Sequence, residues 1–274
     1  MRSTRSNSFK SKFKNTLETV LNPKDDADDF IAMKVSILTT KTFMFDKVSV
    51  PSVGFGCAED NEGSGFNQGV GLVGLGREPL SLVSQLKKST FSYCLTSIND
   101  DTSSGNPSST LVMGSLESQI ANDSVFTTPS IKNPSQPSFY YLSLQGISIG
   151  NVDLPIKKST LEINSYGIGG VIIDSGTTIT YLEEFAFNML NKEFVSQTNL
   201  NVDNSGSTCL DLCFELTSDD GSGEMSIEIP KLVFHFDGAS LDLPGKNYMI
   251  GDMNTGVACL TKGGSSGISI FGNI

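Results

Sequence analysis

The stretch that decides the fold is Val171-Ile172-Ile173-Asp174-Ser175-Gly176-Thr177-Thr178. Its three apolar residues predict a short buried strand, after which the chain presents a carboxylate. Gly176 permits a tight turn and a close approach of the backbone. Ser175 and Thr177 place hydroxyl groups beside the acid, and Thr178 extends this polar segment. Because a carboxylate at a buried turn needs hydrogen-bond partners, we expect the turn to form a cradle for Asp174.

The residues around this stretch predict a mostly β protein. Short apolar runs alternate with clusters of Gly, Pro, Asn, Asp and Ser, and this spacing is typical of strands joined by turns. Residues 140–153 predict a hairpin that turns at Gly150-Asn151. Residues 232–243 predict a second hairpin that turns at Asp237-Gly238.

Two helices interrupt the predicted strands. The run from Leu80 to Leu86 predicts a short one. A longer helix should follow the deciding stretch, where apolar residues recur at roughly helical spacing: Leu182, Phe185, Met189 and Phe194. Thr180 and Glu183 fit a capping box, which would start this second helix.

The composition is acidic. The chain has 274 residues, with 19 Lys and Arg against 30 Asp and Glu, and a formal net charge of -11 at pH 7. This balance argues against nucleic acid and anionic membranes as partners, because phosphates would repel the protein. No apolar run is long enough to cross a membrane as a helix. We therefore expect a globular protein with neither partner.

The start of the chain differs from the rest. Residues 1–14 contain five basic residues and no acidic one. They lack the apolar segment of a secretory signal, although a Ser/Arg/Lys-rich start loosely fits a transit peptide. We interpret residues 1–38 as a disordered segment or one outside the main fold.

The five cysteines are Cys57, Cys94, Cys209, Cys213 and Cys259. Cysteines scattered through a Gly/Ser-rich acidic chain indicate disulfides and a secretory-pathway relative. Cys209 and Cys213 lie four residues apart, but no second Cys or His cluster completes a zinc site. We expect no metal and no cofactor.

Two motifs suggest other chemistries but stand in the wrong surroundings. Gly69–Gly74 matches G-x-G-x-x-G, yet a dinucleotide site needs a following helix, and Leu75-Gly76-Arg77-Glu78-Pro79 does not favour one. Gly146–Gly150 matches the G-x-S-x-G of serine hydrolases, but here it runs from a strand into a hairpin, so Ser148 should lie flat in a sheet. We interpret His235 as an outward-facing strand residue and not as the base for Ser148.

Further motifs accompany the Asp-Ser-Gly-Thr-Thr stretch. They are Gly56-Cys57, Gly71–Arg77, Leu80–Leu86, Phe91–Leu95, Phe139–Leu142, Asp211–Phe214 and Ser269–Asn273. Together with that stretch, they resemble the pepsin-like aspartic proteases, and among them the plant nepenthesin-like branch. The resemblance is continuous from about Lys41 to Ile274 and rests on highly specific motifs.

The resemblance implies a pepsin-like acid protease fold, with two β-rich lobes that each supply one Asp-(Thr/Ser)-Gly turn. Asp174 matches the catalytic aspartate of the second lobe, and Thr177 matches the hydroxyl that hydrogen-bonds it. Ser175 matches a residue through which the two turns grip each other. Ile270-Phe271-Gly272 would support the turn from behind, and Leu72-Val73-Gly74 would do so in the first lobe. The resemblance also implies a disulfide between Cys213 and Cys259.

The implied division places a partial first lobe before a nearly complete second lobe. Residues 39–128 are the remnant of the first lobe, residues 129–138 are a linker rich in proline, and residues 139–274 are the second lobe. This sequence departs from the family pattern in two respects. No Asp-Thr-Gly or second Asp-Ser-Gly string precedes residue 71, and we expect the chain to lack the last strand of the family pattern.

This departure bears on the chemistry. Family members hydrolyse polypeptides with two carboxylates that share a proton, one acting on a water and the other on the carbonyl oxygen. The resemblance therefore implies an aspartic endopeptidase. Because one carboxylate is absent, we expect this chain to be inactive alone, and the question whether it is itself an enzyme stays open. The alternatives are a non-catalytic binding protein similar to the xylanase inhibitors and a non-functional fragment. The family suggests a secreted or vacuolar location, and exposed lobe surface suggests self-association.

Overall fold

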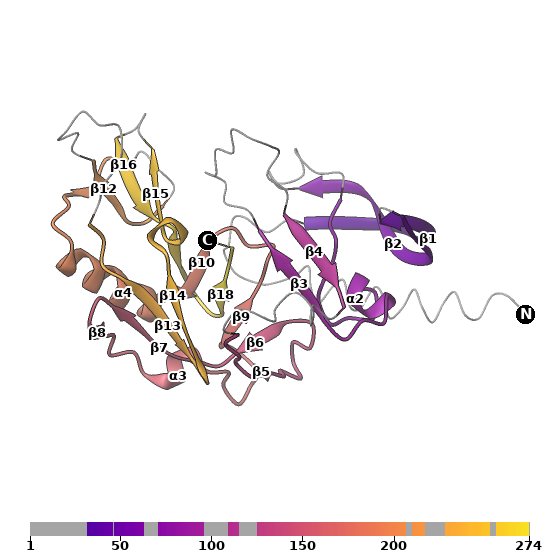
Figure 1. Cartoon of the computed structure of the whole chain (residues 1–274), viewed down its shortest axis with the longest axis horizontal. Helices are drawn as coiled ribbons and strands as arrows, with labels where there is room; N and C mark the ends of the chain where they lie inside the picture. The colour runs from indigo at the N-terminus through magenta and orange to yellow at the C-terminus, as the bar shows by residue number, and fades with distance from the viewer. Residues whose placement is uncertain are drawn as a thin grey trace, which may run out of the picture. The chain divides into compact units, whose positions relative to one another are not determined.

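A computed structural model describes residues 32–45, 47–62, 71–95, 109–114, 125–206, 210–216, 228–252 and 256–273. The chain forms two compact units, Met1–Leu116 (the first unit) and Glu117–Ile274 (the second unit). Strands dominate in both units (Figure 1), as the alternating pattern predicts. The helices in the described ranges are too short or too polar to span a bilayer.

In its described residues, the first unit contains two antiparallel pairs of strands and one short helix. Its elements are β1 (Ala32–Phe45), β2 (Val48–Glu62), α2 (Leu82–Gln85), β3 (Phe91–Cys94) and β4 (Thr110–Met113). Residues 32–38 belong to β1, so this part of the segment expected to be disordered is a strand; residues 1–31 lie outside the described residues. Residues 32–38 have a weak strand pattern in the sequence, but pairing with β2 holds them in a strand.

The short helix of the first unit confirms the prediction for Leu80–Leu86. Ser81 caps α2, because its side chain accepts a hydrogen bond from the Ser84 N–H at 3.2 Å. Gln85 then joins α2 to β2. Its Oε1 accepts from the Gly54 N–H at 2.7 Å, and its Nε2 donates to the Gly54 carbonyl at 2.9 Å.

The described residues of the second unit form three sheets, with strand orders β17-β10-β18-β9-β6-β5, β14-β13-β7-β8 and β11-β12-β16-β15. The strands of the first sheet are β5 (Ser130–Ile131), β6 (Tyr140–Leu142), β9 (Val171–Ile173), β10 (Thr180–Glu183), β17 (Lys262–Ser265) and β18 (Ser269–Phe271). Those of the second are β7 (Leu144–Ile149), β8 (Val152–Asp153), β13 (Leu232–Phe236) and β14 (Ala239–Leu243). Those of the third are β11 (Val202–Asp203), β12 (Cys213–Glu215), β15 (Met249–Asp252) and β16 (Val257–Leu260). Two short helical turns complete the unit, α3 (Lys158–Leu161) and η2 (Gly245–Asn247), together with the longer α4 (Glu184–Gln197).

Both predicted hairpins of the second unit are present. β7 pairs with β8 around Gly150, which has a φ of 57°, and β13 pairs with β14 around Gly238, which has a φ of 78°. Such positive φ angles are open to glycine without steric cost, so each turn forms where the sequence places it.

Helix α4 forms as expected, but its start and its buried face differ from the prediction. Glu183 itself caps the helix, because its carboxylate accepts from the N–H groups of Phe185 at 3.0 Å and Ala186 at 3.3 Å. Thr180 is part of β10, so the predicted capping box is wrong. The buried face consists of Ala186, Phe187, Leu190 and Phe194. Leu182 belongs to strand β10, so it is not a valid starting point for the helical period. The predicted buried face of α4 was therefore rotated relative to the observed one.

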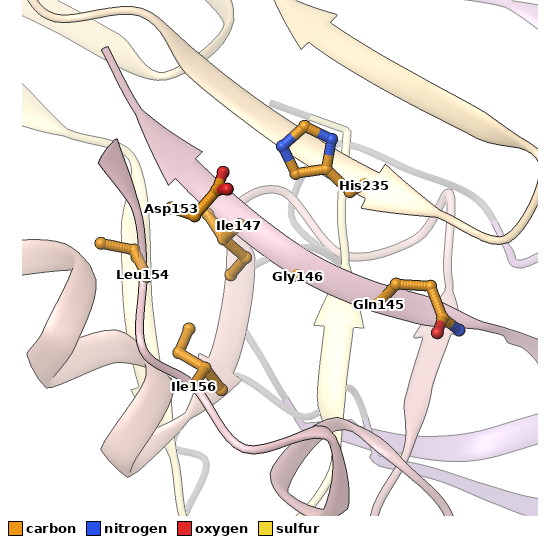
Figure 2. Close-up of a pocket in the computed structure, with 7 residues that line it drawn as sticks. All are labelled: Gln145, Gly146, Ile147, Asp153, Leu154, Ile156 and His235. Carbon is orange, nitrogen blue, oxygen red and sulfur yellow. The ribbon is translucent and has the colours of Figure 1, made fainter. Parts of the chain in front are cut away.

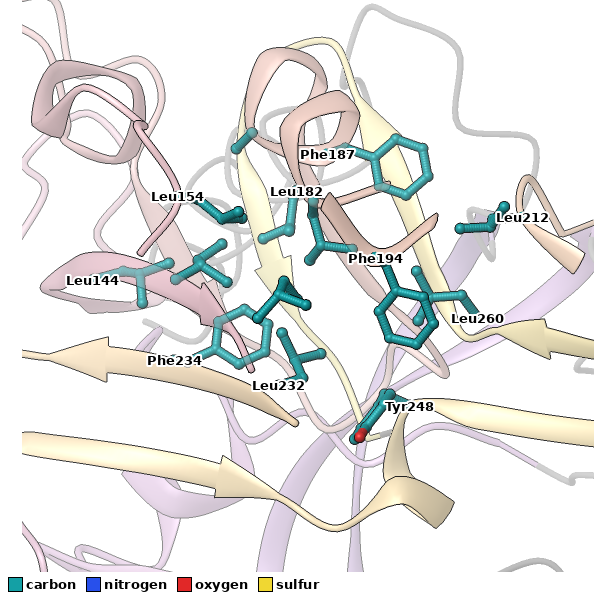
Figure 3. Packing of buried hydrophobic residues seen from close by; sticks show 14 of the residues in the cluster. Leu144, Leu154, Leu182, Phe187, Phe194, Leu212, Leu232, Phe234, Tyr248 and Leu260 are labelled. Carbon is teal, nitrogen blue, oxygen red and sulfur yellow. The ribbon is translucent and has the colours of Figure 1, made fainter. Parts of the chain in front are cut away.

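The hydrophobic core of the second unit lies between α4 and the sheets. Figure 3 shows Phe194, Phe234 and Leu260 among the side chains that fill it. Phe194 packs against Phe214 and Tyr248, with ring centroids 5.9 and 6.2 Å away. Phe234 from β13 packs against Phe271 from β18 at 5.2 Å. These contacts join the strand that supports the Asp174 turn to the body of the unit.

The stretch 129–138, expected as a linker, partly belongs to a sheet. β5 within it pairs with β6 through Ser130 and Leu142. Asn133 is buried, and its Nδ2 donates to the Gly167 carbonyl at 2.8 Å. Proline and serine content alone did not predict this pairing, and the division into lobes stays a prediction.

Candidate functional site

The Asp174 turn begins where β9 ends. β9 lies between β6 and β18 and runs parallel to β18, with Ile172 opposite Ile270. Val171 and Ile172 are buried, which anchors the strand, whereas Ile173 is partly exposed. The Asp174 N–H donates to the Phe271 carbonyl at 3.0 Å. The sheet thus fixes the backbone of Asp174 directly.

Both oxygens of the Asp174 carboxylate are held by hydrogen bonds. Oδ1 accepts from the Gly176 N–H at 2.9 Å, and Oδ2 accepts from Thr177 Oγ1 at 2.7 Å. The second contact is the one that the resemblance implies for Thr177. The carboxylate is exposed, contrary to the expected buried turn, because the chain leaves the sheet at Ile173. The cradle therefore holds a carboxylate that solvent can reach.

The segment after β18 supports the turn from behind. A Cβ at Gly272 would lie 2.7 Å from the Thr177 carbonyl oxygen, so only glycine fits there. The Gly272 N–H donates to Thr180 Oγ1 at 3.3 Å, and the Asn273 N–H donates to the Thr177 carbonyl at 2.9 Å. The Asn273 side chain donates from Nδ2 to the Ser175 carbonyl at 2.7 Å.

The structure thus brings together most of the residues predicted for the site. Ser175 is half-buried, and Thr178 is exposed next to the turn. Sequence reasoning missed Thr180 and Asn273 as supports of the turn. Asn273 closes the Phe-Gly-Asn motif, which was the available signal for it.

Cys213 and Cys259 form a disulfide and face each other across β12 and β16. This is the pair that the resemblance implies. It packs with Val257, Leu210 and Ile250 in a small cluster separate from the main core. Cys57 and Cys94 are exposed, and Cys209 lies outside the described residues.

The G-x-S-x-G motif lies flat in β7, as expected, but its serine contacts the histidine. Ser148 Oγ lies 2.6 Å from His235 Nε2, and Ser240 Oγ lies 2.9 Å from His235 Nδ1. His235 is therefore anchored between two hydroxyls, a contact that the sequence did not predict because it depends on the register of β7 and β13.

A pocket of about 310 Å³ adjoins this histidine (Figure 2). Its lining is Gln145, Gly146, Ile147, Asp153, Leu154, Ile156 and His235. Ser148 is only 7% exposed, lies within a strand, and is not part of the lining. A serine nucleophile needs a sharp exposed turn, so this contact does not make a hydrolase site.

The G-x-G-x-x-G motif is not followed by the helix that a dinucleotide site requires. Gly69 and Val70 lie outside the described residues, and residues 71–75 are irregular. The next helix, α2, has only four residues. Within the described ranges, His, Cys, Asp and Glu side chains form no group of three that could hold a metal ion.

Two family models match the chain. Residues 3–115 match the model described as xylanase inhibitor N-terminal, and residues 139–274 match the one described as xylanase inhibitor C-terminal. The second matched range contains the whole Asp174 turn and its support at Gly272 and Asn273.

Curated relatives of this chain are plant aspartic proteases. The chain is 47% identical to aspartic proteinase nepenthesin-1 and 45% identical to nepenthesin-2 of Nepenthes gracilis, over 86% of this chain and 52% of each relative. It is 34% identical to protein ASPARTIC PROTEASE IN GUARD CELL 2 of Arabidopsis thaliana, over 86% of this chain and 48% of the relative. The chain thus spans about half the length of the curated relatives it matches.

Solved structures share the fold. Basic 7S globulin from soybean matches with a TM-score of 0.58 at 21% identity, over 82% of this chain and 59% of the other. Conglutin gamma from lupine seeds, also a basic 7S globulin, matches with a TM-score of 0.59 at 20% identity, over 88% of this chain and 62% of the other. From its sequence relatives, its two family models and this fold, the chain belongs to the plant nepenthesin-like branch of the pepsin-like aspartic protease family.

Proposed function

We propose that Asp174 is one of the two catalytic aspartates of an aspartic endopeptidase, and that this chain alone does not hydrolyse peptides. The observation that carries the proposal is the presentation of the carboxylate. Asp174 is exposed, and each of its oxygens accepts one hydrogen bond from its own turn. The protease names of the relatives favour the same chemistry.

The geometry suits a carboxylate that shares a proton with a partner. A carboxylate oxygen can accept two hydrogen bonds, so Oδ1 and Oδ2 each keep capacity for a water or a second carboxyl group. Because Gly176 and Thr177 fix the orientation of the carboxylate, that remaining capacity is directed toward solvent. In the paired mechanism, one carboxylate takes a proton from the water and the other protonates the carbonyl oxygen of the peptide.

The inactivity of the chain alone follows from the missing partner. Like carboxylates about 3 Å apart cannot both ionise, and this is what separates their roles as acid and base. The sequence before residue 71 contains no Asp-Thr-Gly or Asp-Ser-Gly string. A lone Asp174 has no second group with which to divide the two proton transfers, and it holds the water from one side only.

The test is cleavage of a denatured protein by the purified chain at roughly pH 3–4, where one carboxyl of such a pair is protonated. We expect no cleavage. Cleavage that a statine inhibitor blocks and Asp174→Asn abolishes would overturn the proposed inactivity. If that cleavage rose steeply with protein concentration, two copies would be supplying the pair.

A non-catalytic binding role is the second candidate, and the two matched family models favour it, because both are described as parts of xylanase inhibitors. The intact Asp174–Thr177 cradle weighs against it, since a pure inhibitor has no need for an oriented carboxylate. Pull-down against glycoside hydrolases and a xylanase inhibition assay would distinguish a binding protein from a non-functional fragment.

A further inference from the structure

Asn273 makes two hydrogen bonds to the Asp174 turn, one on each side of Gly176. Its backbone N–H donates to the Thr177 carbonyl at 2.9 Å, and its side-chain Nδ2 donates to the Ser175 carbonyl at 2.7 Å. The first bond continues the contact between β18 and the turn. The second reaches the middle of the turn and depends on the side chain alone.

The Ser175 carbonyl and the Gly176 N–H belong to the same peptide unit. In a planar trans peptide, these two groups point in opposite directions. Asn273 holds the carbonyl edge, while the N–H edge donates to Asp174 Oδ1 at 2.9 Å. A continuous chain of hydrogen bonds therefore runs from the Asn273 amide, through one peptide, to the carboxylate.

This peptide is the central peptide of a β-turn. Residues 174–177 form a β-turn, closed by the Thr177 N–H and the Asp174 carbonyl at 3.4 Å. The two common β-turn types differ by a flip of the central peptide, and a glycine at the third position tolerates both. Gly176 has no positive φ, so the turn is in the form that does not require one there. After a flip, the Gly176 N–H would no longer point toward Asp174.

We infer that Asn273 is a positioning residue for Asp174: its side-chain amide selects the peptide orientation that directs the Gly176 N–H at the carboxylate. Hydrogen bonds in such a chain polarise one another, so Asn273 also strengthens the bond to Oδ1. The importance for catalysis rests on the proposed function, whereas the orientation of the peptide does not.

The test measures amide hydrogen exchange in the full chain, by mass spectrometry with fragmentation that resolves single amides. In Asn273→Ala we expect the Gly176 amide to exchange at least about fivefold faster, corresponding to roughly 1 kcal/mol for one lost hydrogen bond. The Asp174 amide, which donates to Phe271, should keep its wild-type rate. Asn204→Ala is the matched control, because Asn204 Nδ2 also donates to a backbone carbonyl, that of Val202 at 3.2 Å.

Asn273→Asp provides a second variant with nearly the same shape. An ionised carboxylate cannot donate to the Ser175 carbonyl, so Gly176 should exchange fast at neutral pH. Below roughly pH 4 the new carboxyl is protonated and can donate, and the rate corrected for intrinsic exchange should return toward wild type. An unchanged Gly176 rate in both variants would overturn the inference. Equal acceleration at Asp174, Gly176 and Thr177 would also overturn it, since that indicates general loosening. These readouts need no catalysis, so they stand apart from the outcome of the peptidase assay.

Discussion

The two units differ in how they bury their side chains. In the second unit, a core of leucine, isoleucine and aromatic residues joins α4 to the sheets. In the described part of the first unit, only Val53 and Ser81 are buried. The Asp174 turn and its supports, Gly272 and Asn273, all belong to the unit with the core. The turn that we propose to be catalytic is thus built entirely from residues of the second unit.

The strand pairing shows the same contrast. Among the residues that the structure describes, the first unit has two sheets of two strands each, whereas the second unit has sheets of six, four and four strands. A two-stranded hairpin is at best marginally stable in water, and unpaired edges invite pairing with other chains. Ile37, Met44 and Val48 on β1 and β2 are exposed, as is Leu111 on β4.

The largest effect that we expect is self-association through the first unit. The exposed apolar side chains on these strands should drive the purified chain into concentration-dependent oligomers, measured by size-exclusion chromatography with light scattering. Replacing Met44 and Val48 by lysine should reduce the association. Tyr166→Ser, which changes an exposed residue of the second unit, should not. A monodisperse wild-type monomer with a sharp unfolding transition would contradict this.

The core of the second unit also contains a lysine, and it should cost stability at neutral and acidic pH. Lys262 is 0% exposed, and burial lowers its pKa to about 7. The unfolded chain keeps the ordinary pKa of 10.5, so between about pH 10.5 and 7 it binds a proton that the folded chain does not. The free energy of unfolding is therefore highest above about pH 10.5, falls as the pH falls to about 7, and stays constant at its lower value below that.

Lys262→Met should remove this pH dependence. By linkage, the gain in unfolding free energy below pH 7 is at most roughly 5 kcal/mol. The gain is smaller than this limit because methionine cannot donate the hydrogen bonds that Lys262 Nζ makes to the carbonyls of Asn247 and Thr261. Urea unfolding at several pH values between 6 and 10 checks the result. Parallel wild-type and variant profiles across this range would contradict the assignment.

The disulfide should stabilise the second unit without affecting the first. Cys213–Cys259 closes a separation of 46 residues, which on the loop-entropy model contributes roughly 4 kcal/mol. Cys213→Ser with Cys259→Ser should lower the urea midpoint of the second unit's transition, as followed by hydrogen exchange in α4. Exchange in β1 and β2 should stay unchanged. An unchanged midpoint in the double variant would contradict this prediction.

The sequence predicted those features that depend on local order and on a specific motif. Turn glycines at 150 and 238 fixed two hairpins, and the Asp-Ser-Gly-Thr-Thr stretch identified the Asp174 cradle with its Thr177 contact. It missed contacts between segments distant in the chain. The Ser148–His235 bond spans 87 residues and the Asn273–Ser175 bond spans 98, and both depend on strand register that no local pattern specifies.

The smallest effects come from replacing one hydrogen-bonding side chain in each unit, and they provide a direct comparison of the units. Ser148→Ala removes the partner of His235 Nε2 but leaves the Ser240 contact at Nδ1. His235 is half-buried, so water can replace the lost hydroxyl, and we expect a loss of about 1 kcal/mol in unfolding free energy.

In the first unit, Gln85→Ala removes three hydrogen bonds, two to Gly54 and one to the Leu80 carbonyl. Because the two bonds to Gly54 connect α2 to β2, we expect a loss of roughly 2 kcal/mol in unfolding free energy and local opening of β2. Hydrogen exchange of β2 and β7 amides checks both variants. A larger effect in β7 than in β2 would show that the first unit does not depend on this side chain.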